Sequence, residues 1–181
     1  MKRWLSALCA LTAVLLLFAG CRQEEDRNRS TGETNQTEAV TETAPKQKLS
    51  LYDLRKAMLG ADASLPEMQA VSSVDEKADE LFAYLSDLDY SKVEGYFLTF
   101  AADGTAYEIA VVALKERSDV SELQSSLRKH VEGRVNLYQS YAPDQVAMAE
   151  NAEIVSSGRY VALIMCGDQE AVKAAFRKGV E

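Results

Sequence analysis

The sequence has little of the chemistry that most enzymes use. His130 is the only histidine among 181 residues, so a Ser-His-Asp or Cys-His arrangement has one candidate base. No glycine-rich phosphate loop occurs, and the flanks of His130 show no metal-ligand spacing. We therefore expect no catalytic residues, no metal and no cofactor, and we interpret His130 as a surface or boundary residue.

Cysteine is also scarce, and its three positions lie far apart. Their spacing indicates neither a zinc site nor a disulfide framework. Cys9 and Cys21 belong to the N-terminal segment, so Cys166 is the one thiol of the region that looks globular. A lone cysteine in an apolar run predicts a small buried hydrophobic side chain rather than a reactive thiol.

Positive charge is in deficit, with 20 Lys and Arg against 28 Asp and Glu and a formal net charge of -8. Most of the negative excess falls in residues 49–181. Binding to nucleic acid needs a clustered basic face, and so does adhesion of a protein surface to anionic lipid. We expect no nucleic-acid partner and no direct contact of the domain surface with lipid headgroups.

The first 20 residues have the layout of a secretory signal peptide. Lys2 and Arg3 precede an apolar run that ends at Gly20, and acidic and polar residues follow abruptly. The run is shorter than the roughly 20 residues that a membrane-spanning helix needs. Residues 1–20 are therefore predicted to be a signal peptide.

Leu17-Phe18-Ala19-Gly20-Cys21 resembles the bacterial lipobox, although Phe18 is less usual there than Leu or Val. Small residues precede the cysteine, whose thiol would carry a diacylglyceryl group through a thioether. Two or three acyl chains, such as palmitate, hold a protein stably on a membrane. We expect a lipoprotein anchored through Cys21 to the extracytoplasmic face of the cell membrane. An uncleaved membrane anchor and ordinary secretion are the alternatives.

Residues 21–48 are rich in Ser, Thr, Glu and Gln, and Val40 is their only large apolar residue. Such a segment cannot bury enough surface to offset the entropy of ordering it, so a disordered tether is predicted. Residues 49–181 are predicted to form one domain.

Hydrophobic periodicity predicts the elements of this domain. Helices are expected over residues 52–59, from the segment 73–76 to Leu85, from 119 to about 141, over 143–148 and after Asp168. Strands are expected over residues 93–102, 105–115, 152–155 and 159–166, and residues 65–71 fit a loop or an edge strand. The strand 105–115 has apolar residues on both faces, which indicates a central position in the sheet.

Three local signals locate turns and caps. Asp103-Gly104 predicts a type I′ hairpin turn, and a second turn is expected near Ser157-Gly158. Ser73-Val74-Asp75-Glu76 has the form of a capping box. The order β-β-α occurs twice, which predicts an α+β fold: an antiparallel sheet of about four strands with helices packed on one face.

From about Leu51 to its end, the chain resembles a family of small bacterial lipoproteins that carry domain of unknown function 4358. The resemblance rests on short motifs whose order and spacing agree: Glu108-Ile109, Arg134, Tyr141-Ala142-Pro143, Glu150-Asn151-Ala152 and Gly158-Arg159-Tyr160-Val161. Members come mostly from Firmicutes and usually have a lipobox and a low-complexity spacer. The resemblance implies location and fold, and it supplies no activity.

Arg134 and Glu108 form the first candidate site. Arg134 follows Val120 and Leu127 at intervals of seven, so it falls near the apolar stripe of its helix. An arginine there must reach solvent or find a carboxylate, and Glu108 is the obvious partner because its strand is otherwise Ala, Ile and Val. The pair is interpreted either as a structural ion pair or as part of a site for an anionic ligand or partner.

Four tyrosines form the second candidate site, and they fit either a shallow groove or the edge of the core. They are Tyr96, Tyr138, Tyr141 and Tyr160.

One catalytic motif occurs, Ser126-Leu127-Arg128-Lys129, which matches the S-x-x-K of penicillin-binding enzymes. It lies in the middle of a predicted helix and lacks the companion motifs, so we set it aside. The first functional hypothesis is a non-catalytic envelope lipoprotein that binds a protein or cell-surface partner. The alternatives are a small-molecule or peptide carrier and an enzyme acting on the cell wall.

Overall fold

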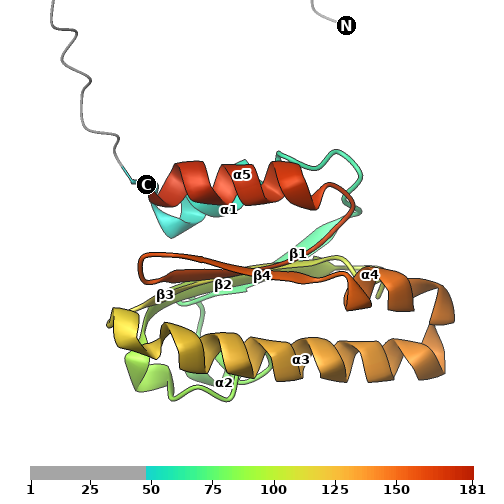
Figure 1. The fold of residues 1–181 in the computed structure, drawn as a ribbon, viewed down its shortest axis with the longest axis horizontal. Coiled ribbons are helices and arrows are strands. Elements are labelled where there is room, and N and C mark those ends of the chain that lie inside the picture. The colour runs from blue at the N-terminus through green and yellow to red at the C-terminus, as the bar shows by residue number, and fades with distance from the viewer. Residues whose placement is uncertain (1–47) are drawn as a thin grey trace, which may run out of the picture. The chain divides into compact units, whose positions relative to one another are not determined.

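The computed structural model describes residues 48–181. Cys21, the predicted signal peptide and nearly all of the predicted tether lie outside the described residues. The described part combines helices with one sheet (Figure 1). Its elements are α1 (Leu51–Leu59), β1 (Met68–Ser72), α2 (Ala78–Phe82), β2 (Val93–Ala101), β3 (Glu108–Leu114), α3 (Val120–Tyr141), α4 (Val146–Glu150), β4 (Glu153–Ser157), β5 (Tyr160–Met165) and α5 (Gln169–Val180).

All neighbouring strands of the sheet pair antiparallel, in the order β1-β2-β3-β5-β4. The predicted α+β class and antiparallel sheet are confirmed. Strand β3 is central, as its two apolar faces indicated, and every residue of β3 and β5 is buried. The sheet has five strands rather than about four, because β1 adopts the edge-strand alternative for its segment.

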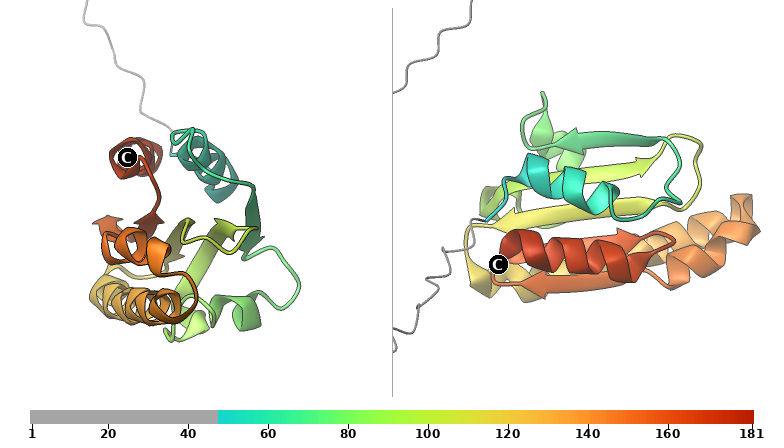
Figure 2. Two further views of the ribbon diagram at one scale, coloured as in Figure 1. Left: turned by 90° about the vertical axis from the view of Figure 1, so that its right-hand side faces the viewer. Right: turned by 90° about the horizontal axis from the view of Figure 1, so that it is seen from above.

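The helices lie on both faces of the sheet, which corrects the prediction that they pack on one. Helices α1 and α5 cover one face, and α2 and α3 cover the other (Figures 1 and 2). The reason lies in β3 and β5, whose side chains are apolar on both sides and require cover on both. Consequently, α3 and α5, which close the two predicted β-β-α units, belong to opposite layers.

The predicted end of α1 and the predicted N-cap of α5 are both present. Asp168 caps α5 by accepting a hydrogen bond from the backbone N–H of Ala171 at 3.1 Å. Gly60 ends α1, and Val172 and Phe176 of α5 are fully buried. Amphipathic spacing and caps therefore fix both helices that close this face.

The turn predicted at Asp103-Gly104 was wrong in detail. The β2–β3 hairpin is present, but strand pairing ends at Phe100 and Glu108, and Gly104 has positive φ while Asp103 does not. The Asp103 carboxylate instead accepts from the backbone N–H of Thr105 at 3.0 Å, which stabilises a longer loop than a type I′ turn.

The predicted capping box does not form. Helix α2 begins after Lys77, whose side chain makes no cap and whose φ is 60°. Asp75 accepts from the backbone N–H of Ser72 at 2.6 Å instead, so its carboxylate closes the end of β1 rather than the start of α2.

Candidate functional site

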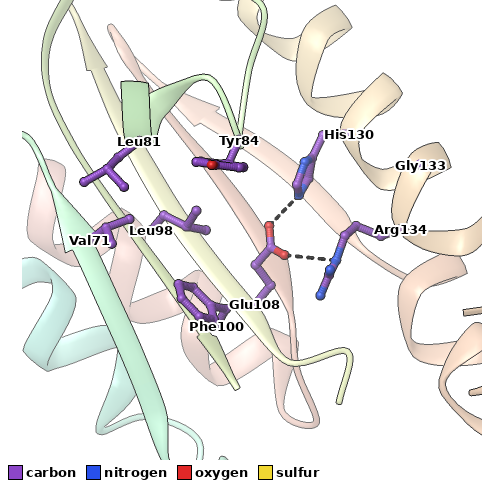
Figure 3. A pocket seen from close by; sticks show the side chains of 9 residues that line it. All are labelled: Val71, Leu81, Tyr84, Leu98, Phe100, Glu108, His130, Gly133 and Arg134. Atoms are coloured by element: carbon purple, nitrogen blue, oxygen red, sulfur yellow. Dashed lines mark hydrogen bonds and ion pairs between the residues drawn. The ribbon is translucent and has the colours of Figure 1, made fainter. Parts of the chain in front are cut away.

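The α2/α3 face of the sheet is covered incompletely. A sheet of five strands is about 19 Å wide between its outer strands, and a helix with its side chains is about 10 Å across, so each face needs two helices. Helix α3 has 22 residues, but α2 has only five. A pocket of about 560 Å³ lies on this face between the two helices, against β1, β2 and β3 (Figure 3). It is lined by Val71, Leu81, Tyr84, Leu98, Phe100, Glu108, His130, Gly133 and Arg134.

One side of the pocket is apolar. Val71, Leu98 and Phe100 project from the first two strands, and Leu81 faces them from α2 (Figure 3). Tyr84 lies on the chain just after α2 and is 76% exposed, so its ring stands at the rim. This side offers contact area for an apolar group.

The opposite side of the pocket is an ionic cluster around Glu108. This carboxylate is only 3% exposed, at the first residue of β3. His130 Nε2 lies 2.6 Å from one carboxylate oxygen, and Arg134 Nε lies 3.3 Å from the other. Because His130 and Arg134 are four residues apart on α3, their side chains share one face of the helix. A buried carboxylate is costly unless it is paired, and these two cationic or hydrogen-bonding groups provide the pairing.

Arg134 is held from a second direction by Tyr138. One guanidinium nitrogen donates to the Tyr138 hydroxyl, and the guanidinium carbon lies 4.9 Å from the centre of the Tyr138 ring. That hydroxyl donates in turn to the carbonyl of Thr105 at 3.0 Å. Burial raises the pKa of Tyr138, so the hydroxyl remains a donor at neutral pH.

The Nε–H of Arg134 is unsatisfied. Its distance to Glu108 is that of an ion pair, but Nε is buried and has no hydrogen-bond partner within residues 48–181. Buried donors are nearly always hydrogen-bonded, so an exception needs an explanation. Here the explanation is the neighbouring Glu108 carboxylate at 3.3 Å, which pairs with Nε ionically although the geometry is not that of a hydrogen bond.

Gly133 completes the pocket wall from the middle of α3. A Cβ added there would have no atom within 4 Å, so neither close packing nor positive φ requires a glycine. Glycine inside a helix costs about 1 kcal/mol relative to alanine. The missing side chain leaves space between His130 and Arg134 on the pocket side of the helix.

The structure brings Glu108 and Arg134 together but does not gather the four tyrosines. Tyr138 contacts Arg134, whereas Tyr96 is fully buried and donates to the carbonyl of Ala78 at 2.7 Å. Tyr160 belongs to the core on the α1/α5 face, and Tyr141 is 82% exposed at the end of α3. The four tyrosines therefore form no common groove in the described residues, because Tyr96 and Tyr160 point to opposite faces of the sheet; Tyr96, Tyr138 and Tyr160 fit the alternative of a place in the core.

The contact of His130 with Glu108 was not predicted from the sequence. Its side chain is 14% exposed, in keeping with a boundary position, but its ring is bonded to the buried Glu108. The signal that was available is the spacing of His130 and Arg134, four residues apart and both near the apolar stripe of α3.

Ser126 and Cys166, which the sequence also pointed to, stabilise the fold and lie outside the pocket lining. The Ser126 hydroxyl lies 2.8 Å from the Ser86 hydroxyl and accepts from the backbone N–H of Asp87, so it ties α3 to the loop before β2. Cys166 is buried, as predicted, and burial raises the pKa of its thiol to about 12.

Residues 48–181 lack a metal-binding cluster and a membrane-spanning helix. No group of three or more His, Cys, Asp and Glu side chains there has an arrangement that could hold a metal ion. None of the helices described is both long enough and apolar enough to cross a bilayer.

A model of the family described as domain of unknown function (DUF4358) matches residues 66–166, and the chain therefore belongs to this family. The match covers more than half of the chain, and it confirms the resemblance drawn from the sequence. It runs from just before β1 to just after β5 and includes every residue that lines the pocket. No curated protein and no solved structure matches the chain.

Proposed function

We propose that this protein is an extracytoplasmic lipoprotein, anchored through Cys21, whose domain binds a partner non-catalytically in the pocket beside α3. The N-terminal sequence supports the location: a positive start, an apolar run and a lipobox-like segment that ends at Cys21. The pocket supports the binding role, because its volume of about 560 Å³ falls within the range of ligand sites.

The observation that carries the binding role is the pocket itself, in which an apolar wall faces Arg134, whose side chain is 25% exposed. A ligand that fits must bring an apolar group together with a hydrogen-bond acceptor. Glu108 already neutralises the charge of Arg134, so a neutral carbonyl suits the site without adding an uncompensated charge. An apolar side chain with its neighbouring peptide carbonyl has this chemistry, and a protein partner supplies both.

A small-molecule carrier is the second candidate. The pocket volume favours it, since a cavity of this size holds a drug-sized molecule. The same criterion of an apolar body with one acceptor applies to such a ligand.

Binding accounts for the site better than catalysis does. The lining residues include no Ser, Thr, Cys or Lys that would act as a nucleophile. Both carboxylate oxygens of Glu108 are already engaged, by His130 and by Arg134.

The anchor is tested by labelling cells with a radioactive fatty acid. Cys21→Ser should abolish incorporation of the label and release the protein from the membrane fraction, because the thioether needs the thiol. Cys9→Ser is the matched control, and it should leave both unchanged. Persistent labelling of the Cys21→Ser protein would disprove the proposed anchor.

The pocket is tested by titrating N-acetylleucine amide, which carries an apolar side chain and peptide carbonyls. Residues 48–181 form one compact unit, so the chain from residue 21 with Cys21→Ser serves as a soluble form. Amide NMR shifts should change around Leu98 and Gly133. Arg134→Met should weaken binding about tenfold, which corresponds to one charge-assisted hydrogen bond of about 1.4 kcal/mol. Arg117→Met, an exposed arginine outside the pocket, should leave binding unchanged. Shifts scattered over the surface would contradict the proposal.

A further inference from the structure

We infer that the partner is an extended, basic peptide segment that adds as a sixth strand to the outer edge of β1 and places an apolar side chain toward the pocket. This inference rests on the proposed binding function. It adds the class of partner and the main-chain contacts that would hold it.

The two edges of the sheet differ in protection. Strand β4 has side-chain contacts to both layers: Glu153 pairs with Lys173 of α5 at 2.8 Å, and Ser156 is 3.4 Å from Gln124 of α3. Strand β1 carries no charged residue, and its Gln69 and Ala70 are exposed. Charges and covering elements are what normally keep an edge strand from pairing, so β1 is the edge that is free to accept a strand.

The register of β1 and β2 identifies which backbone groups are free. Ser73 donates to the Tyr96 carbonyl, and Ala102 donates to the Glu67 carbonyl, so odd-numbered residues bond to β2. The N–H and C=O groups of Met68, Ala70 and Ser72 therefore point outward. Those of Ser72 are both taken by Asp75.

Met68 and Ala70 remain as the open positions. Their outward backbone groups have no hydrogen-bond partner among the residues that the structure describes. An antiparallel strand would exchange two hydrogen bonds with each residue, four in all. Asp75 closes one end of this slot, and Pro66, which has no N–H, lies just beyond the other.

The pleat of the sheet connects this edge to the pocket. Val71 lines the pocket from β1, so its face of the strand is the α2/α3 face. Partner residues opposite Gln69 and Val71 would point to the same face, because residues directly across a ladder share a side. The partner should therefore carry apolar residues two positions apart.

The charges near the edge specify the flanks of the peptide. The segment from Glu67 to the end of α2 contains one basic residue, Lys77, which is already paired with Glu80. Its acidic residues are Glu67, Asp75, Glu76, Asp79 and Glu80. Lys or Arg on either side of the apolar positions would complement this charge, and salt should weaken the attraction.

The test begins with a phage-displayed library of random nonapeptides, panned against the soluble form described above. We expect enrichment of apolar residues at positions i and i+2 with Lys or Arg outside them. An i, i+3, i+4 pattern would indicate a bound helix and would overturn the inference. An absence of any enriched pattern would overturn it as well.

The most enriched peptide is then synthesised, and its Kd is measured for the parent protein and for the variants Ala70→Pro, Ala70→Thr and Arg134→Met. Ala70→Pro removes one outward N–H and blocks the edge but leaves the bonds to β2, so affinity should fall more than tenfold. Ala70→Thr keeps the N–H and should stay within about threefold of the parent protein by the same argument. Retained β1–β2 amide shifts show that the Ala70→Pro protein is folded. Binding should also weaken several-fold between about 50 and 300 mM salt.

The outcomes separate this inference from the proposed function. If Arg134→Met weakens binding and Ala70→Pro does not, the edge is excluded and the pocket stands. If neither variant changes the Kd, both the β1 edge and the pocket are excluded as the binding site. A concentration-dependent dimer that Ala70→Pro dissociates would overturn the basic peptide in favour of a second copy of the chain.

Discussion

Helices α1 and α5 cover one face of the sheet with a small pocket of about 110 Å³ beside α1, whereas α3 and the five-residue α2 leave a pocket of about 560 Å³ on the other. The first face is closed mainly by apolar contacts, among them those of Leu54, Phe97 and Phe176. On the second face, the buried Glu108 pairs with His130 and Arg134, and these three residues line one side of the pocket. The site therefore arises where one layer of helices lacks a second full-length helix.

The largest difference is expected between two phenylalanines of β2 that point to opposite faces. Phe97 is 1% exposed in the closed face, so Phe97→Ala should lower the free energy of unfolding by about 3–5 kcal/mol through the cavity it leaves. Phe100 is only partly buried and lines the pocket, so Phe100→Ala should cost about 1–2 kcal/mol. Urea denaturation measures both. Equal losses would mean that the two faces are equally well packed.

The next effect concerns the charge of Glu108. Glu108→Gln keeps the shape but removes the charge that pairs with Arg134, and we expect a loss of about 2–3 kcal/mol in unfolding free energy. Glu94 of β2 is the matched control, because it pairs with Arg159 while half exposed. Glu94→Gln should cost less than about 1 kcal/mol. Similar values for the two variants would show that the pocket cluster is no stronger than a surface pair.

A buried carboxylate on the closed side predicts a dependence of stability on pH. Burial alone would raise the pKa of Asp62, but hydrogen bonds from the Ser64 side chain, the Asp168 N–H and the Ser64 N–H lower it from 3.8 to about 2. A lowered pKa in the folded state stabilises the protein above the unfolded pKa, and this contribution is lost as pH falls to the folded pKa. We expect a loss of about 2 kcal/mol between pH 4 and pH 2.

Asp62→Asn isolates this contribution from that of the other carboxylates. The difference in unfolding free energy between the parent protein and Asp62→Asn should shrink over the same pH range. A difference that stays constant down to pH 2 would refute the assignment to Asp62.

The smallest effect contrasts two helical glycines, and its sign differs between the faces. Gly133→Ala should raise the unfolding free energy by about 0.5–1 kcal/mol, because its Cβ would meet nothing within 4 Å. Gly179→Ala should lower it by about 1 kcal/mol, since that Cβ would lie 2.5 Å from the buried side chain of Leu54. Thermal or urea denaturation measures both. Destabilisation by Gly133→Ala would show that the space beside α3 is filled.

Much of the domain followed from local pattern. The long amphipathic α3, the caps at Gly60 and Asp168 and the central position of β3 all agree with the sequence. Failures occurred where a side chain had two possible partners. Asp75 bonds to Ser72 rather than capping α2, and Asp103 closes a longer loop than the turn that its dipeptide suggests.

The candidate site was predicted in part. Arg134 and Glu108 were paired because each was a charged residue in an apolar setting, and their contact is present. His130 and Gly133 were not recognised, because their significance depends on what lies opposite α3. The sequence left a groove and the edge of the core open for the four tyrosines, because no local pattern indicates which face of the sheet each ring occupies.

The sequence by itself determined most of the elements, the caps at Gly60 and Asp168 and the need for a carboxylate near Arg134, because periodicity, caps and the cost of a buried charge are local quantities. Only the tertiary structure decided which helix covers which face, and thereby left a pocket beside α3 and an unpaired edge at β1. Both depend on how much of the five-stranded sheet the helices of each layer cover, and no single segment of the sequence encodes that coverage.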